Sequence, residues 1–112
     1  MFRDDRQTAL VCSALCSRVG VADAWTADGP GPVAFAVQEG RSPLSSGQQV
    51  MVLAAWAFWN GEGGLTLARM LDVLDPKNMG ALAELLVAAS IGSDAVDTWL
   101  RRFGPTPRSL AH

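Results

Sequence analysis

Two cysteines and a few carboxylates are the residues whose types and spacing could support chemistry in this 112-residue chain. Cys12 and Cys16 are four residues apart, so on a helix they would share one face, as half of a metal site or as a redox pair. A zinc site normally needs four ligands, and the single histidine, His112, is the last residue. In a mostly apolar helix, such cysteines are more often small core residues. We therefore expect no metal site here.

The position of the histidine also argues against nucleophilic catalysis, because no histidine within the predicted fold could serve as a base for serine or cysteine. Asp72 and Asp75, and likewise Asp94 and Asp97, are three residues apart, but helix capping or solvation accounts for each pair. The glycines at 61–64 lack the spacing of a phosphate-binding loop. The sequence therefore predicts no catalytic residue, no cofactor and no enzyme activity.

The elements that would position these residues are organised around the apolar run VMVLAAWAFW at residues 50–59. The run is too short to cross a membrane, which takes roughly 20 apolar residues. Its alanine, leucine and methionine residues favour a helix over a buried strand. Ser45 and Ser46 each precede a glutamine by three residues, as in a capping box, and Asn60-Gly61 tolerates the left-handed conformation that ends helices. We expect a buried helix at about 46–60.

Apolar residues at helical spacing predict further helices at about 5–18, 67–74, 76–90 and 93–103, and a short helical turn at 21–27. Ser93 is expected to cap the last helix. The expected buried stripes are Leu67, Met70, Leu71 and Leu74; Met79, Leu82, Leu86 and Ala89; and Val96, Trp99, Leu100 and Phe103.

The segment between the first helix and the apolar run is harder to assign. The sequence DGPGP at 28–32 is expected to break regular structure. Val33, Phe35 and Val37 then alternate with alanine, a pattern typical of one short strand at 33–37. An isolated strand has no obvious pairing partner, so it could pair across a dimer, or the segment could be merely extended and packed on the helices.

These elements predict a mainly all-α fold, an irregular bundle of about five helices around the central helix at 46–60. Residues 1–104 are expected to form a single helical domain, and residues 105–112 a disordered C-terminal tail. The charged N-terminus MFRDDRQ does not resemble a signal peptide, so we expect a cytoplasmic location.

Composition favours a function in binding. The net charge of −2 disfavours a nucleic-acid binder with a broad basic face. The hydrophobic content of 49% is high for a small chain, which favours an apolar surface covered by a partner or by a homodimer. We therefore expect a cytosolic, non-catalytic module that binds another protein, as an adaptor or an inhibitor. Its candidate partner-binding residues are Trp25, Trp59, Trp99, Arg101 and Arg102.

Two alternatives belong to other function classes. One is a helical domain that binds a small ligand or lipid in a pocket lined by Trp56, Phe58 and Trp59. The other is a helical DNA-binding regulator, because the segment around 75–77 has the coarse shape of a helix–turn–helix motif. Its second helix carries few charges that could grip phosphates.

Overall fold

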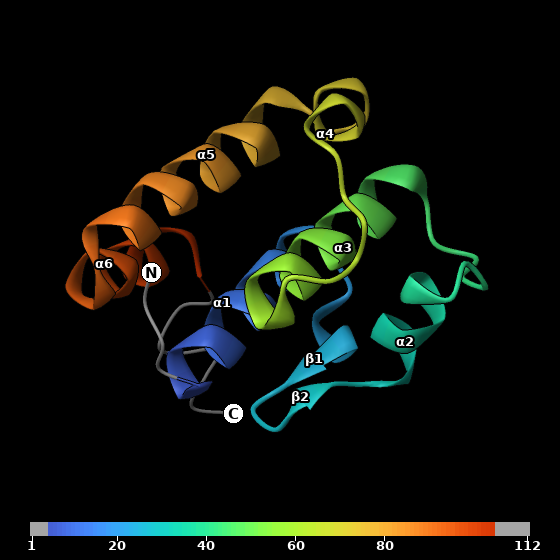
Figure 1. The fold of residues 1–112 in the computed structure, drawn as a ribbon, viewed down its shortest axis with the longest axis horizontal. Coiled ribbons are helices and arrows are strands. Elements are labelled where there is room, and N and C mark those ends of the chain that lie inside the picture. Colours follow the sequence, from blue (N-terminus) through green and yellow to red (C-terminus); the bar gives the residue numbers. More distant parts are fainter. Residues whose placement is uncertain (1–4, 105–112) are drawn as a thin grey trace.

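The computed structural model describes residues 5–104, and helices make up most of them (Figure 1). The elements in chain order are α1 (Asp5–Arg18), a 3₁₀ turn (Ala22–Ala24), β1 (Trp25–Thr26), β2 (Gly29–Pro30), α2 (Pro32–Gln38), α3 (Ser46–Asn60), α4 (Leu67–Val73), α5 (Pro76–Ile91) and α6 (Ser93–Phe103). The prediction of a mainly all-α fold is confirmed. The predicted tail at 105–112 lies outside the described residues.

Local sequence signals set the ends of α3. The Ser45 side chain accepts a hydrogen bond from the Gln48 backbone N–H at 3.3 Å, and the Gln48 side chain accepts one from the Ser45 N–H at 3.1 Å. Gly61 ends the helix in the left-handed conformation, with a φ of 79°. Every residue from Val50 to Trp56 is buried, as the apolar run predicts, whereas Ala57 is exposed and Phe58 and Trp59 are half-buried.

Helix α1 shares the centre of the molecule with α3. Its buried residues are Gln7, Thr8, Ala9, Val11, Cys12, Ala14, Leu15 and Cys16. The two helices lie against each other, and α5 and α6 cover one side of the pair (Figure 1). The core therefore has two central helices, where the sequence singled out one.

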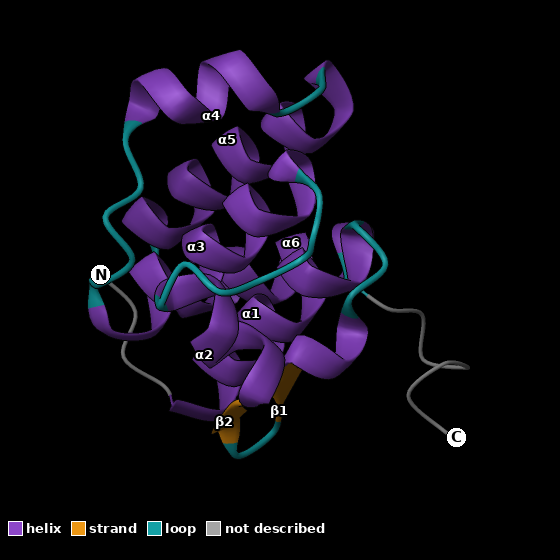
Figure 2. Cartoon of the chain, turned by 90° about the vertical axis from the view of Figure 1, so that its right-hand side faces the viewer, coloured by secondary structure: helices purple, strands orange, loops and turns teal. Residues whose placement is uncertain are grey.

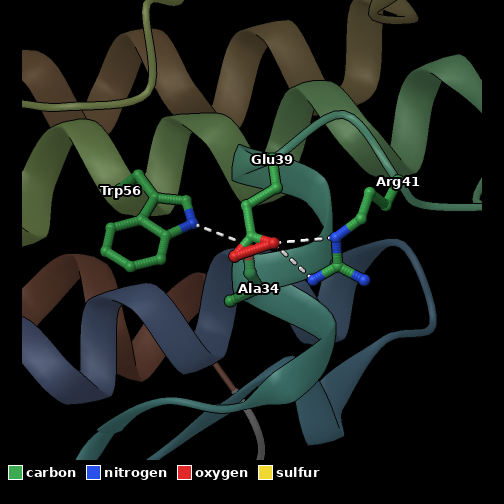
Figure 3. A network of polar contacts seen from close by, with 4 residues as sticks. All are labelled: Ala34, Glu39, Arg41 and Trp56. Carbon is green, nitrogen blue, oxygen red and sulfur yellow. Dashed lines mark hydrogen bonds and ion pairs between the residues drawn. The ribbon is translucent and has the colours of Figure 1, made fainter.

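The predicted strand at 33–37 is wrong, because these residues lie in α2. Pro32 stands at the start of α2, where its fixed φ suits a helix and its missing N–H is not needed. A helix also satisfies its own backbone groups, which an unpaired strand could not do. The Trp56 indole N–H donates to the backbone oxygen of Ala34 at 2.9 Å, which fastens α2 to α3 (Figure 3). Just past α2, Arg41 donates to the Glu39 carboxylate at 2.7 Å.

The strands are found instead just before α2: β1 lies in the predicted helical turn at 21–27, and β2 in the segment at 28–32 that was expected to be irregular. β1 and β2 form a two-residue antiparallel hairpin in which Trp25 pairs with Pro30 and Thr26 with Gly29 (Figure 2). The Thr26 hydroxyl donates to the Gly29 oxygen at 3.1 Å and accepts from the Asp28 N–H at 3.2 Å. This local hydrogen bonding lets so short a hairpin close. The predicted helical turn at 21–27 is reduced to the 3₁₀ turn before β1.

Three expectations about individual residues of α4 to α6 are also wrong. Leu67 and Leu71 are exposed, since α4 has seven residues and lies at the edge of the fold with no residue buried. Leu86 is 52% exposed, because α5 turns its alanine-rich face, with Leu82 and Leu85, toward the core. Ser93 lies inside α6 instead of capping it, and its hydroxyl donates to the Gln7 side chain at 3.2 Å.

Within residues 5–104, no helix has both the length and the apolar character needed to cross a membrane.

Candidate functional site

The two cysteines are core residues in the structure. Both are free and buried, and the Cys12 thiol donates to the Ala55 oxygen at 3.2 Å, which links α1 to α3. Burial raises the pKa of the Cys12 thiol well above its ordinary range, and Cys16 adds repulsion. Burial, with a smaller effect from Asp23, raises the pKa of Cys16 to about 12. Because the thiolate is the reactive form, this environment keeps both thiols inert.

Of the three tryptophans that we expected at a partner interface, Trp25 and Trp99 are buried and Trp59 is half-buried. Trp25 is 2% exposed and packs edge-on against Trp56 and Trp59, with ring centroids 5.2 and 5.8 Å away. Trp59 is half-buried and lies over Gly29, where a Cβ atom would come within 3.1 Å of its ring. Trp99 is 4% exposed. A partner would not reach the rings of Trp25 and Trp99 without a change in the core.

The aromatic residues of the proposed ligand pocket belong to the same region. The Trp56 ring forms T-shaped contacts with Trp25 and with Phe35, and both ring centroids are 5.2 Å from its own. Phe58 and Trp59 are half-buried at the border of this cluster. A ligand-binding role for them stays a prediction, as does DNA binding by the α4–α5 segment.

Trp99 instead fixes the angle between α5 and α6. Its indole N–H donates to the backbone oxygen of Ala81 at 2.8 Å, and its ring lies 5.5 Å from that of Phe103. Gly92 joins the two helices with a φ of 144°, a backbone conformation that favours glycine. The two helices therefore form a tight hairpin along one side of the molecule (Figure 1).

A shallow groove of about 460 Å³ runs along the outside of this hairpin. Ala88 and Ala95 line it together with two large side chains of α5, Val87 and Ile91, which are 60% and 73% exposed. Thr98 contributes a hydroxyl from α6. Removing apolar side chains such as these from water is favourable. In the α5–α6 groove, no other described residue covers them.

The two candidate arginines stand at one end of the α5–α6 groove. Arg102 forms an ion pair of 2.8 Å with Glu84, which lines the groove, and its guanidinium lies 4.8 Å from the centre of the Phe103 ring. Arg101 donates to the Thr98 hydroxyl at 3.1 Å. The structure thus brings Arg101 and Arg102 together with the groove and leaves Trp25 and Trp59 on another part of the fold.

Val87 and Ile91 are the site residues that sequence reasoning missed. Lys77 and Glu84 are the sole charged residues of α5. A surface helix normally has a polar face. Because α5 has two charges in 16 residues, its sequence already indicated more apolar surface than one core can bury.

The α5–α6 groove offers mainly apolar contacts. Its lining is mostly alanine, valine and isoleucine, with the Glu84 carboxylate and the Thr98 hydroxyl as polar groups. Among residues 5–104, no three histidine, cysteine or acidic side chains lie close enough together to hold a metal ion. Such a surface can bind apolar side chains and orient them by charge at one end.

No protein-family model, no curated protein and no solved structure matches the chain.

Proposed function

We propose that this protein is a non-catalytic binding module that takes a segment of another protein in its α5–α6 groove, and so works as an adaptor or an inhibitor in the cytoplasm. The observation that carries the proposal is the exposure of Val87 and Ile91 along one groove of a helix hairpin that the Trp99–Ala81 hydrogen bond holds together. Exposed apolar surface rimmed by polar residues is typical of protein interaction sites.

The rim of the groove supports a polypeptide as the ligand. Thr98 and the ion pair of Glu84 and Arg102 offer polar contacts beside the apolar floor. An apolar centre with a polar rim is the usual arrangement at protein interfaces. An amphipathic helix, with apolar residues three and four positions apart, would match a groove formed between two helices.

A photo-crosslinking amino acid placed at Val87 tests the proposal in cells of the native host. We expect the Val87 probe to form an adduct with one other polypeptide, and the further substitution Ile91→Asp to lower the yield about tenfold. Leu71 is the matched control, because it is equally apolar and 64% exposed but lies on α4. The same adducts at Leu71 and Val87, or none at Val87 in a folded protein, would show that the groove is not the binding site.

A further inference from the structure

We propose that in the free protein the α5–α6 groove is covered by a second copy of the chain, in a two-fold symmetric dimer whose two α6 helices run antiparallel. This inference rests on the proposed function, since the same groove would receive the other protein. Self-association then regulates the site, because a partner must displace the second copy before it can bind.

Charge is the first argument for a second copy. Asp94 lies in the first turn of α6 and Arg101 in the last, and both are exposed. They are seven residues apart, which on a helix is two turns, or about 10 Å, on the same side. The Arg102 charge is offset by Glu84, whereas Arg101 contacts the neutral Thr98 hydroxyl. The outer side of α6 therefore has a negative end and a positive end.

A two-fold axis turns this asymmetry into complementarity. When the axis crosses α6 at right angles, the helices run antiparallel, and Asp94 of each copy faces Arg101 of the other. The same contact then occurs twice. A parallel arrangement would place Asp94 against Asp94 and Arg101 against Arg101, which like-charge repulsion disfavours. The charges thus select one of the two orientations.

Side-chain size along α5 is the second argument. The outward residues Gly80, Ala83, Val87 and Ile91 are three or four apart, so they form one row on the helix. The row grows from no side chain at Gly80 to a branched one at Ile91. In the antiparallel dimer, Ile91 of one copy lies opposite the small residues of the other. Val87 lies near the two-fold axis, beside Val87 of the second copy.

The size of the face sets the expected strength. Helix α5 has 16 residues, hence a length of about 24 Å, and two packed helices are about 20 Å wide. The dimer would therefore bury on the order of 1,000 Å² in total, which is at the lower limit for a specific interface. We expect a dimer with a dissociation constant in the micromolar range, weak enough for a partner to displace.

Charge reversal tests the dimer with the full chain in sedimentation equilibrium. Asp94→Arg and Arg101→Asp each create two like-charge contacts across the axis, so each variant alone is expected to dimerise about tenfold more weakly. Mixed in equal amounts, they should form a heterodimer, because both contacts then join opposite charges again. Asp72→Arg is the control, since Asp72 is exposed on α4, and it should dimerise like the wild type. Circular dichroism checks that the variants keep their helices.

Three results would overturn the dimer: a wild type that stays monomeric at high micromolar concentration, single variants that dimerise normally, or variants that do not associate when mixed. None of these touches the proposed function. That function depends on whether the Val87 probe captures a different polypeptide, and an adduct of Val87 with a second copy has a distinct mass.

Discussion

The two buried thiols make the stability of the protein depend on pH in the alkaline range. Cys12 and Cys16 have pKa values raised by burial, for Cys16 to about 12, whereas in the unfolded chain a cysteine titrates near 8.5. Above that pH the unfolded chain releases protons that the folded chain keeps. The free energy of unfolding therefore falls as the pH rises. The stability that the two protonated thiols give the folded protein is fully present below about pH 8 and is lost progressively above it.

The size of the effect follows from the same linkage. Between pH 8 and pH 10, each thiol is expected to lower the free energy of unfolding by about 2 kcal/mol, and the two together by about 4 kcal/mol. That is a large share of the roughly 5–15 kcal/mol that stabilises a typical domain. The sequence has no tyrosine and four tryptophans, so few other groups interfere and fluorescence reports unfolding.

Urea denaturation at a series of pH values measures this dependence. Replacing Cys12 or Cys16 by alanine should halve the slope of stability against pH, and replacing both should remove the thiol contribution. Cavities left by alanine lower the stability equally at every pH, so the slope separates the two effects. If the wild type and the double variant lose stability in parallel between pH 8 and pH 10, the thiols do not titrate as their burial requires.

Two further predictions concern the hydrogen bonds that organise α3. Trp56→Phe removes the donor to the buried Ala34 oxygen and should lower the free energy of unfolding by about 2–4 kcal/mol, whereas Trp59→Phe, at a half-buried position, should lower it less. Ser45→Ala removes the helix cap and should lower the free energy of unfolding by about 1 kcal/mol. Ser46→Ala, at the first residue of α3, should change the free energy of unfolding by less than about 0.5 kcal/mol. Urea titrations of the four variants check both pairs, and equal losses within a pair would contradict the assignment.

The sequence alone was sufficient where the signals are local. The ends of α3 followed from Ser45, Gln48 and Gly61, because capping involves residues within one turn of each other. Asp75 likewise caps α5, accepting from the Asn78 N–H at 2.8 Å. The burial of Cys12 and Cys16 followed from the apolar residues Val11, Ala14 and Leu15 beside them on the helix, which are buried with them.

Tertiary structure decided what local patterns left open. The alternation in residues 33–37 suits a strand, but Pro32 at the helix start and the bond from Trp56 to Ala34 favour a helix there. Pro32 is a local signal, but the bond from Trp56 cannot be read from the segment itself. Trp25, Trp59 and Trp99 were assigned to a partner interface because tryptophan is common there, and the burial of Trp25 and Trp99 depends on how distant elements pack around them.

The candidate site shows the same division most clearly. An α5 with charges at Lys77 and Glu84 alone has more apolar surface than one core can bury, and that much is written in the sequence. Which part stays outside depends on the rotation of the helix about its axis, and Trp99 helps to set that by bonding to Ala81. The composition of α5 therefore determined that an apolar face would be exposed. Only packing against α6 decided that the exposed face would be the one with Val87 and Ile91, because the burial of a side chain depends on its neighbours in space.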